Sequence, residues 1–404
     1  MSTTSTRCVE DSALTRRPLY LAFELGDRQW MLGLTIGLGQ RPRRRVIAAR
    51  ALDVLWEEIA RAKARLGLAA DAPVVSCYEA GPDGFWLHRA LVAHGITNVI
   101  VDASSIEVNR RARRAKADKL DVEKLVEMLV RYQAGERRVW HVVRVPSVAD
   151  EDRRHLERER QSRVQEHTRL LNRIRGLLAT QGVVLPLHGD VPAALARVQL
   201  WDGSALPPGL VARLTREWHR VETVAAELRA LAAARRALLS RRATRRTPAH
   251  EAGHLRDDVG ARTCAQRLMQ LRSIGPTIAW ALSTELFAWR QFRNRREVGA
   301  VMGLVPTPYQ SGTSHHEQGI SRARNARLRG LAVELAWLWL RHQPESALSQ
   351  WYAQRFAHGG PRLRRIGIVA LARKLIIALW RYVQDGQLPA GARLKPVSTA
   401  ARAA

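Results

Sequence analysis

The sequence predicts an α/β domain at the N-terminus, an α-helical coiled coil in the middle and a mainly α-helical domain at the C-terminus. Three patterns lead to this expectation. Between residues 18 and 146, short apolar runs bounded by Gly, Pro and Asp alternate with amphipathic segments. Apolar residues then recur three and four positions apart in two long charged segments. The remainder holds apolar, Trp-rich segments with helical spacing. A chain of 404 residues has room for two or three domains.

The N-terminal domain, residues 18–146, follows a tail of residues 1–17 that we expect to be disordered. Strands are expected at 19–23, 29–36, 44–49, 73–78 and 97–101, and helices at 51–66, 86–94 and 114–129. Turn residues separate the first three strands, which indicates an antiparallel meander. The whole order is that of an RNase H-like fold, in which a mixed sheet carries acids at the ends of adjacent strands and on a late helix.

The expected helix at 114–129 begins with two acids on its apolar face. Residues four apart share a helix face, so Asp118 lies in line with Val122, and Asp121 with Leu125. Two like charges this close are costly unless a cation lies between them. The alternative is that acids in a first helical turn only complement the helix macrodipole.

Two further acids end strands of the expected sheet. Glu24 follows the first strand and Glu79 the fourth. Together with the two aspartates of the helix, they form a carboxylate set that suits two divalent cations about 3.5 to 4 Å apart, with a scissile phosphate held between them. Asp27 competes with Glu24 as a ligand, whereas a capping role is the simpler interpretation of Asp102, which ends the fifth strand.

The middle domain, residues 147–246, carries a heptad-like seam. Its members are Val164, His167, Leu171, Ile174 and Leu178, and then Val211, Leu214, Trp218, Val221, Ala225, Leu228 and Ala232. Two such helices form either an intrachain hairpin or a dimer contact, and a rigid spacer is the plainer alternative. We expect a homo-oligomer, a dimer or tetramer, through this coiled coil. The cationic segment 235–246 is suited to lie on phosphate.

The C-terminal domain, residues 247–384, has a turn at 271–277 between two helical runs. It resembles a helix-hairpin-helix element, in which backbone N–H groups near Gly275 and Thr277 would bind a phosphate without reading sequence. A plain Gly-Pro turn is the alternative. Trp337, Trp339 and Trp380 are expected in the core, and residues 385–404 are expected to form a loose basic tail.

A Pro- and Gly-rich loop is expected at 303–316, where Ser311 precedes a glycine. A basic helix follows, whose arginines we expect to contact nucleic acid: Arg322, Arg324, Arg327 and Arg329. A serine hydroxyl beside flexible backbone and cations can attack a phosphodiester. Loop serines more often only form turns.

The charge of the chain indicates its class of partner. A formal net charge of +29 and a pI near 11.5 favour a polyanion, and nucleic acid before membrane. No apolar run is long enough to span a bilayer, and the first residues do not have the pattern of a secretion signal. The widely spaced Cys8, Cys77 and Cys264 are expected to be inert thiols in a reducing compartment, so we expect a cytoplasmic protein.

An ordered set of short motifs between residues 18 and 384 resembles the DEDD transposases of bacterial insertion sequences. The motifs are Ala22-Phe23-Glu24-Leu25, Tyr78-Glu79-Ala80-Gly81, Ala117-Asp118-Lys119-Leu120-Asp121, Ile274-Gly275-Pro276-Thr277, Gln310-Ser311-Gly312-Thr313-Ser314 and Val369-Ala370-Leu371-Ala372-Arg373-Lys374-Leu375. The resemblance implies a RuvC-like N-terminal domain, a coiled coil and a C-terminal transposase domain.

The resemblance also implies the chemistry of the site. Its four acids, Glu24, Glu79, Asp118 and Asp121, would bind two Mg²⁺ ions, with Mn²⁺ as a substitute, and Ser311 would form a covalent link to DNA. Relatives in one branch use a bridge RNA and act as oligomers, which implies DNA, a structured guide RNA and further copies of this chain as partners.

Two positions depart from the family pattern. Glu24 stands where many relatives have Asp, and Arg272-Ser273 replaces the usual Pro-Gly before the hairpin. Ser314 is the alternative nucleophile if the first serine only shapes the turn. Two other functions fit the same sequence: a RuvC-like nuclease that hydrolyses DNA with metal-activated water, and a non-enzymatic basic protein that bridges nucleic acids.

Overall fold

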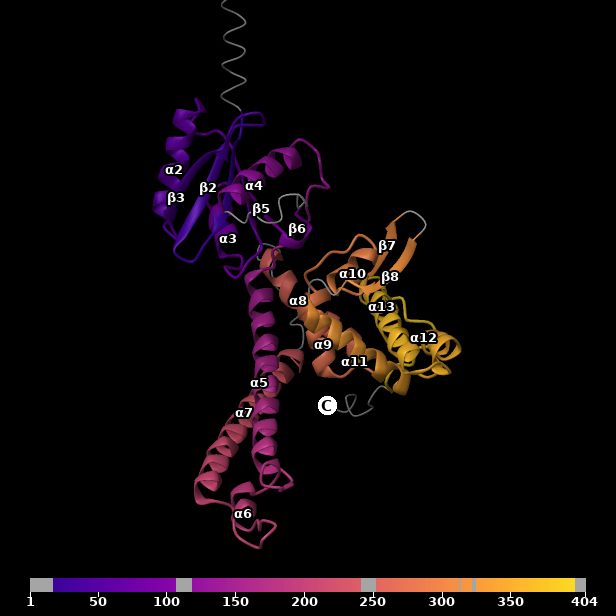
Figure 1. Cartoon of the computed structure of the whole chain (residues 1–404). Coiled ribbons are helices and arrows are strands. Elements are labelled where there is room, and N and C mark those ends of the chain that lie inside the picture. Colours follow the sequence, from indigo (N-terminus) through magenta and orange to yellow (C-terminus); the bar gives the residue numbers. More distant parts are fainter. Residues whose placement is uncertain (1–16, 107–117, 241–251, 312–313, 322–324, 397–404) are drawn as a thin grey trace, which may run out of the picture. The chain divides into compact units, whose positions relative to one another are not determined.

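The computed structural model describes residues 17–106, 118–240, 252–311, 314–321 and 325–396. At residues 104, 118–121, 252–259, 307–311 and 314–318 it describes the backbone only. The chain divides into two units, Met1–Val145 and Pro146–Ala404. The elements of each are labelled in Figure 1.

A six-stranded mixed sheet forms the centre of the first unit, in the order β3-β2-β1-β4-β5-β6. Its strands are β1 (Leu19–Leu25), β2 (Gln29–Thr35), β3 (Arg43–Ala48), β4 (Val74–Glu79), β5 (Thr97–Val101) and β6 (Val142–Val143). The first three form the predicted antiparallel meander, while β4 runs parallel to both β1 and β5. The five predicted strands are confirmed to within two residues at each end, and the short β6 was not predicted.

Helices cover both faces of this sheet. Its helical elements are α2 (Leu52–Arg65), α3 (Trp86–Ala93), the 3-10 turn η1 (Ala103–Ser105) and α4 (Asp118–Gln133). Because side chains alternate along a strand, Leu21 and Phe23 pack with α2 and α3, whereas Ala22 packs with α4 on the opposite face. The α/β class of this unit is therefore confirmed.

The second unit is mostly helical. It contains α5 (Val148–Ala179), α6 (Val191–Ala196), α7 (Pro208–Ser240), α8 (Ala252–Met269), α9 (Pro276–Leu282), the π-helical turn η4 (Ser283–Phe287), α10 (Arg295–Val301), β7 (Pro306–Ser311), β8 (Ser314–Ile320), α11 (Ala326–His342), α12 (Ala347–Tyr352), the π-helical turn η5 (Ala353–Ala357) and α13 (Pro361–Asp385). Among the described residues, no helix is long and apolar enough to cross a membrane.

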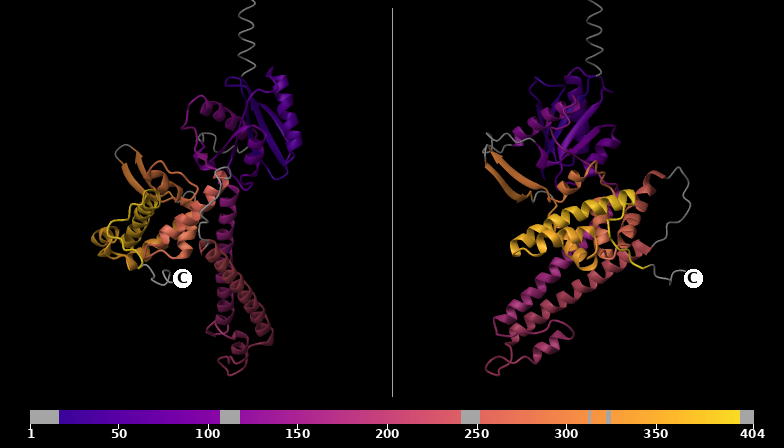
Figure 2. Two further views of the ribbon diagram at one scale, coloured as in Figure 1. Left: turned by 180° about the vertical axis from the view of Figure 1, so that it is seen from behind. Right: turned by 90° about the vertical axis from the view of Figure 1, so that its right-hand side faces the viewer.

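The long helices α5 and α7 form an intrachain hairpin and lie side by side in every view (Figures 1 and 2). The seam allowed either an intrachain hairpin or a dimer contact, and the structure shows the hairpin. Ile174 and Leu178 are buried against Leu214 and Trp218, as the seam predicts. Val164, the first residue of the predicted seam, is 39% exposed, so the prediction is wrong at that position.

Within the predicted loop the structure has two paired strands, β7 (Pro306–Ser311) and the beginning of β8 (Ser314–Ile320). Strand β7 pairs with β8 in an antiparallel register, with an irregularity between Pro306 and Pro308. Proline cannot donate to a strand ladder, and a two-stranded sheet tolerates it because both strands are edges.

The C-terminal helices α8, α9, α11 and α13 share one apolar core. Trp339 is fully buried within it, as predicted, and Trp380 packs against it. Trp337 is 50% exposed, so the prediction of a core position is wrong there. It lies two residues from Trp339, which places it on the other side of α11.

Two buried carboxylates connect the helices of the second unit. Glu285 on η4 is 1% exposed and lies 3.3 Å from Arg154 and 3.1 Å from Arg158, both on α5. Arg327 on α11 lies 3.4 Å from Glu285 and 2.7 Å from Glu157, whose side chain is 2% exposed. These ion pairs fix η4 and α11 against α5 across more than a hundred residues of sequence.

We predict that Glu285→Gln lowers the free energy of unfolding of the second unit by about 3 kcal/mol, because it removes the shared partner of buried arginines. Glu345→Gln is the control: its ion pair with Arg393 is exposed on both sides, so we expect a loss below about 1 kcal/mol. Urea unfolding of both variants beside the unmodified protein measures the difference. Equal losses would show that burial of the cluster contributes nothing.

Candidate active site and nucleic-acid interface

Glu24 and Glu79 lie side by side at the C-terminal ends of the two central strands of the first unit's sheet. Strands β1 and β4 are parallel neighbours, and their register pairs Phe23 with Tyr78, the residues immediately before the two glutamates. Both carboxylates therefore stand at the C-terminal ends of adjacent strands. Both are half-buried. The backbone thus brings these two acids to neighbouring strand ends.

The side chains of both acids belong to the face of the sheet that α4 covers. Glu24 pairs with Met31, which packs in the core beneath α4, and Glu79 is two residues beyond Cys77, which packs in the same core. The Cys77 thiol donates to the backbone oxygen of Leu125 at 3.8 Å. Burial, and after it the negative charge of Glu79, raise the pKa of this thiol. It therefore remains a neutral thiol, as predicted.

Helix α4 approaches the sheet most closely at its N-terminal end. A Cβ atom placed on Gly33 of β2 would lie 3.1 Å from the backbone oxygen of Val122 and 3.1 Å from its side chain. A larger residue at this position would push the helix away from the sheet by a few tenths of an ångström. Gly33 pairs with Ala22, two residues before Glu24 on the same face, so the beginning of α4 is held over the part of β1 that leads to the acid.

Asp118 and Asp121 open this helix, as predicted, with Asp121 directly before Val122. Their side chains lie outside the described residues, and the convergence of all four carboxylates stays a prediction. Among the side chains that the structure describes, no group of three or more acids, histidines or cysteines is placed to hold a metal. The carboxylate oxygens of Glu24 and Glu79 are of the type that Mg²⁺ prefers, so the described acids fit that ion chemically.

The competing acid Asp102 has a structural role at the end of β5. Its backbone oxygen accepts hydrogen bonds from the backbone N–H of Ser105 at 2.8 Å and from the Ser105 hydroxyl at 2.7 Å. Its backbone therefore starts the turn η1, while the capping role of its carboxylate stays a prediction. Asp27 is exposed in the turn between β1 and β2.

Ser311 ends β7, and the hairpin register places it opposite Ser314, which begins β8. Their side chains lie outside the described residues, as do residues 312 and 313 between them. Ser311 is five residues beyond Pro306, where β7 leaves the helical core. Both candidate nucleophiles therefore stand at the far end of the hairpin. The choice between them stays a prediction.

The predicted helix-hairpin-helix turn lies between α8 and α9. Gly275 is the N-cap of α9, and no side chain caps it. Thr277 follows Pro276 in the first turn of α9. The turn borders a pocket of about 690 Å³.

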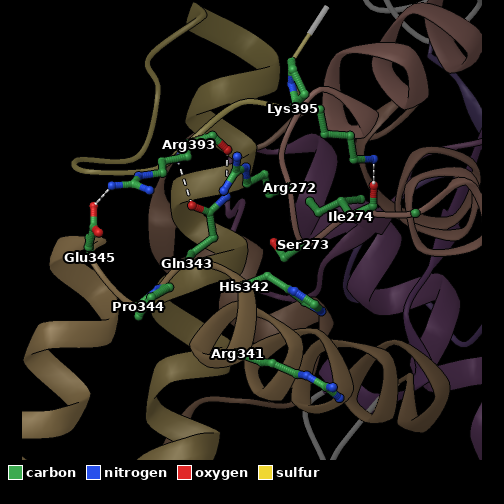
Figure 3. A pocket seen from close by; sticks show the side chains of 12 residues that line it. Arg272, Ser273, Ile274, Arg341, His342, Gln343, Pro344, Glu345, Arg393 and Lys395 are labelled. Carbon is green, nitrogen blue, oxygen red and sulfur yellow. Dashed lines mark hydrogen bonds and ion pairs between the residues drawn. The ribbon is translucent and has the colours of Figure 1, made fainter. Parts of the chain in front are cut away.

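Figure 3 shows four cationic side chains around this pocket, Arg272, Arg341, Arg393 and Lys395, together with the imidazole of His342. The hydroxyl of Ser273, a residue 8% exposed, has no hydrogen-bond partner there. One acid, Glu345, also lines the pocket and is paired with Arg393. The remaining positive charge and the buried hydroxyl are suited to a phosphate.

Residues 385–396 do not form the predicted loose tail. Lys395 donates its backbone N–H to the oxygen of Gln270 at 2.7 Å and its ammonium to the oxygen of Ile274, also at 2.7 Å. Gln343 holds the backbone of Arg393 through two hydrogen bonds of 2.8 Å. The segment thus brings two cations to the α8–α9 turn, which no local sequence signal announced.

Of the arginines predicted to contact nucleic acid after the serine loop, Arg327 has another role. Its guanidinium is in the buried ion pairs with Glu157 and Glu285, because α11 packs against α5. The prediction is therefore corrected at this residue. Arg329 is half-buried on α11, and Arg322 and Arg324 lie outside the described residues.

Known proteins resemble this chain over most of its length. Residues 265–352, which include the α8–α9 turn and the serine hairpin, match the model of the family described as Transposase IS116/IS110/IS902. A putative transposase of Sinorhizobium fredii, y4rJ, is 41% identical over 93% of this chain and 94% of its own length. The transposase for insertion sequence element IS1328 of Yersinia enterocolitica is 28% identical over 57% of this chain and 62% of its own. The transposase for element IS1111A of Coxiella burnetii is 25% identical over 63% of each chain.

We predict that Gly33→Val weakens Mg²⁺ binding about tenfold, because the new side chain displaces the start of α4 from the sheet. We expect it also to lower the free energy of unfolding by about 1 to 3 kcal/mol. The control is Gly37→Val, since a Cβ at Gly37 meets nothing within 4 Å. Calorimetric titration with Mg²⁺ measures both variants. Unchanged Mg²⁺ binding in Gly33→Val would show that the position of α4 does not affect the metal site.

Proposed function

This chain belongs to the IS116/IS110/IS902 transposase family, whose enzymes cut and rejoin DNA, and from this premise we propose that it does so by metal-dependent phosphoryl transfer with Ser311 as the nucleophile. The observation that carries the proposal is the pair of acids, Glu24 and Glu79, at neighbouring strand ends beneath the helix that begins at Asp118. A carboxylate set built from strand ends and one helix is suited to hold cations beside a phosphate.

The residues that would hold the metal are Glu24, Glu79, Asp118 and Asp121. The fit is chemical, because carboxylate oxygens are the ligands that Mg²⁺ prefers, with Mn²⁺ as the expected substitute. Glu24 is half-buried at the end of β1. There its longer side chain can extend past the strand end. The chemistry that two bound Mg²⁺ ions supply is neutralisation of phosphate charge and polarisation of the reacting oxygens.

The serine would take part in two exchange steps. In the first, the Ser311 oxygen forms a bond to phosphorus as its proton leaves to water, and the bond from phosphorus to the departing DNA strand breaks as that strand's oxygen takes up a proton. In the second, a hydroxyl of another DNA end attacks the same phosphorus and restores the serine. One phosphoester bond forms for each that breaks, so rejoining needs no external energy source.

DNA binding is supported by charge in the second unit. The pocket at the α8–α9 turn holds three arginines and a lysine beside Gly275, and Thr277 follows in α9; such cations suit phosphate contacts. We extend the proposal to a structured guide RNA and to a homo-oligomer, a dimer or tetramer, in the cytoplasm. Since the α5–α7 seam is used within the chain, other subunits would have to contact the outer faces of that hairpin.

We predict that Ser311→Ala abolishes both strand exchange and the covalent protein–DNA adduct, whereas Ser314→Ala retains both. The physical reason is that only one hydroxyl can be the attacking atom. The assay combines a plasmid carrying the element ends with denaturing gels that reveal the adduct. Ser162→Ala, at an exposed position on α5, is the matched control. The opposite result for the two serines would transfer the role to Ser314.

We also predict that Asp121→Asn lowers strand exchange by at least about a hundredfold, because the amide cannot replace a charged metal ligand. Asp53→Asn, exposed in the first turn of α2, is the control. Cleavage by the unmodified protein with Mg²⁺ but without any adduct would instead indicate a nuclease that uses activated water. Binding without Mg²⁺-dependent cleavage would indicate a non-enzymatic bridging protein.

A further inference from the structure

A second hollow in the second unit, here called the cationic groove, lies between α10, the base of the β7–β8 hairpin, α12 and α13. Its volume is about 1120 Å³. The cations that line it are Arg295, Arg296, Arg362, Arg365, Arg373 and Lys374. No described residue of its lining is acidic. The groove is separate from the α8–α9 pocket, with which it shares no residue.

The cations of the groove differ from the arginines that hold the helices of this unit together, because the described residues offer them no acidic partner. Arg154, Arg158 and Arg327 are each paired with a buried glutamate. Within the described part of the chain, none of the six groove cations forms an ion pair. Like charges gathered in one hollow repel one another, and an anionic ligand is the direct means of relieving that repulsion.

Two of these cations are positioned by their neighbours. Arg373 lies across α10 at Gly299, where an added Cβ would come within 3.1 Å of its Nε. Lys374 holds its ammonium 4.7 Å from the centre of the Trp351 ring. The missing side chain of Gly299 leaves room for Arg373. The Trp351 ring holds Lys374 at the groove.

The wall of the groove is apolar between the charges. Ile320, Trp351 and Ile377 contribute to it, and Ile366 is 52% exposed there. A double helix presents mainly phosphates to a protein surface, and a hollow with apolar walls gains nothing from them. An unpaired strand offers phosphates to the charged rim and base faces to the apolar wall.

We propose that the cationic groove binds an unpaired DNA strand. The choice of DNA rests on the proposed function: Pro306 and Ile320 line the groove and belong to the hairpin whose far end carries Ser311. The five steps along the strand from Pro306 to Ser311 span about 17 Å, so a strand in the groove lies a few nucleotides from the candidate nucleophile. The groove would hold the strand that is displaced when the DNA is opened for exchange.

The test compares the full chain with the triple variant Arg362→Ala, Arg365→Ala and Lys374→Ala. Fluorescence anisotropy measures binding of a labelled single-stranded DNA, its duplex and an RNA of the same sequence over a range of salt concentrations. We expect at least a tenfold weaker affinity for single-stranded DNA, less than threefold for the duplex, and a salt slope reduced by about 2. Thermal unfolding checks that the variants fold.

The matched control removes the same charge elsewhere: Arg213→Ala, Arg216→Ala and Arg229→Ala, all exposed on α7. It should leave the affinity for single-stranded DNA within about twofold, since unspecific loss of charge acts weakly. A second variant, Ile366→Ala, keeps every charge. We expect about threefold weaker binding of single-stranded DNA with an unchanged salt slope, because it removes only apolar contact with bases.

Three results would overturn the proposal: an equal loss for duplex and single strand, a loss confined to RNA, or no loss in the triple variant. The first would indicate a site for the duplex backbone and the second a site for a guide RNA. Because these measurements need no catalysis, they stay separate from the proposed function. Activity in Ser311→Ala would remove the nucleophile without changing the binding result.

Discussion

Two buried carboxylates, Glu157 and Glu285, determine how the second unit is assembled. Each is almost fully removed from solvent and each contacts Arg327, so α5, η4 and α11 meet at one point. Burying such charges is costly unless every one is paired. The packing of the serine-bearing half of the unit therefore depends on arginines that lie far away in the sequence, in a helix that the apolar seam alone would describe as a spacer.

An equally strict constraint, the strand register, acts at the C-terminal ends of the central strands in the first unit's sheet. Parallel pairing of β1 with β4 aligns Glu24 and Glu79, and strand alternation turns both toward α4. The absent side chain of Gly33 lets α4 approach the sheet at Val122. A strand register shifted by one residue would turn one acid to the opposite face, so the proposed chemistry depends on hydrogen-bond register as much as on the acids themselves.

The excess of positive charge has two different uses in this protein. Arginines such as Arg154 and Arg158 neutralise buried glutamates and hold helices together. Others line the α8–α9 pocket and the cationic groove, where their charge is available to a polyanion. A net charge of +29 indicates the class of partner, but it does not distinguish a structural arginine such as Arg327 from a binding one.

The sequence by itself determined the first five strands of the first unit with their helices, the position of Glu24 and of Glu79 at strand ends, the α5 and α7 helices and the family. These follow from local periodicity and short motifs, which need no knowledge of distant residues. Only the tertiary structure decided that β1 and β4 bring the two glutamates together, that β7 and β8 pair, that Arg327 is an internal ion-pair partner and that residues 385–396 complete a pocket. The partner of a charge and the wall of a pocket are set by segments far apart in the chain, and a sequence pattern does not contain the distances between them.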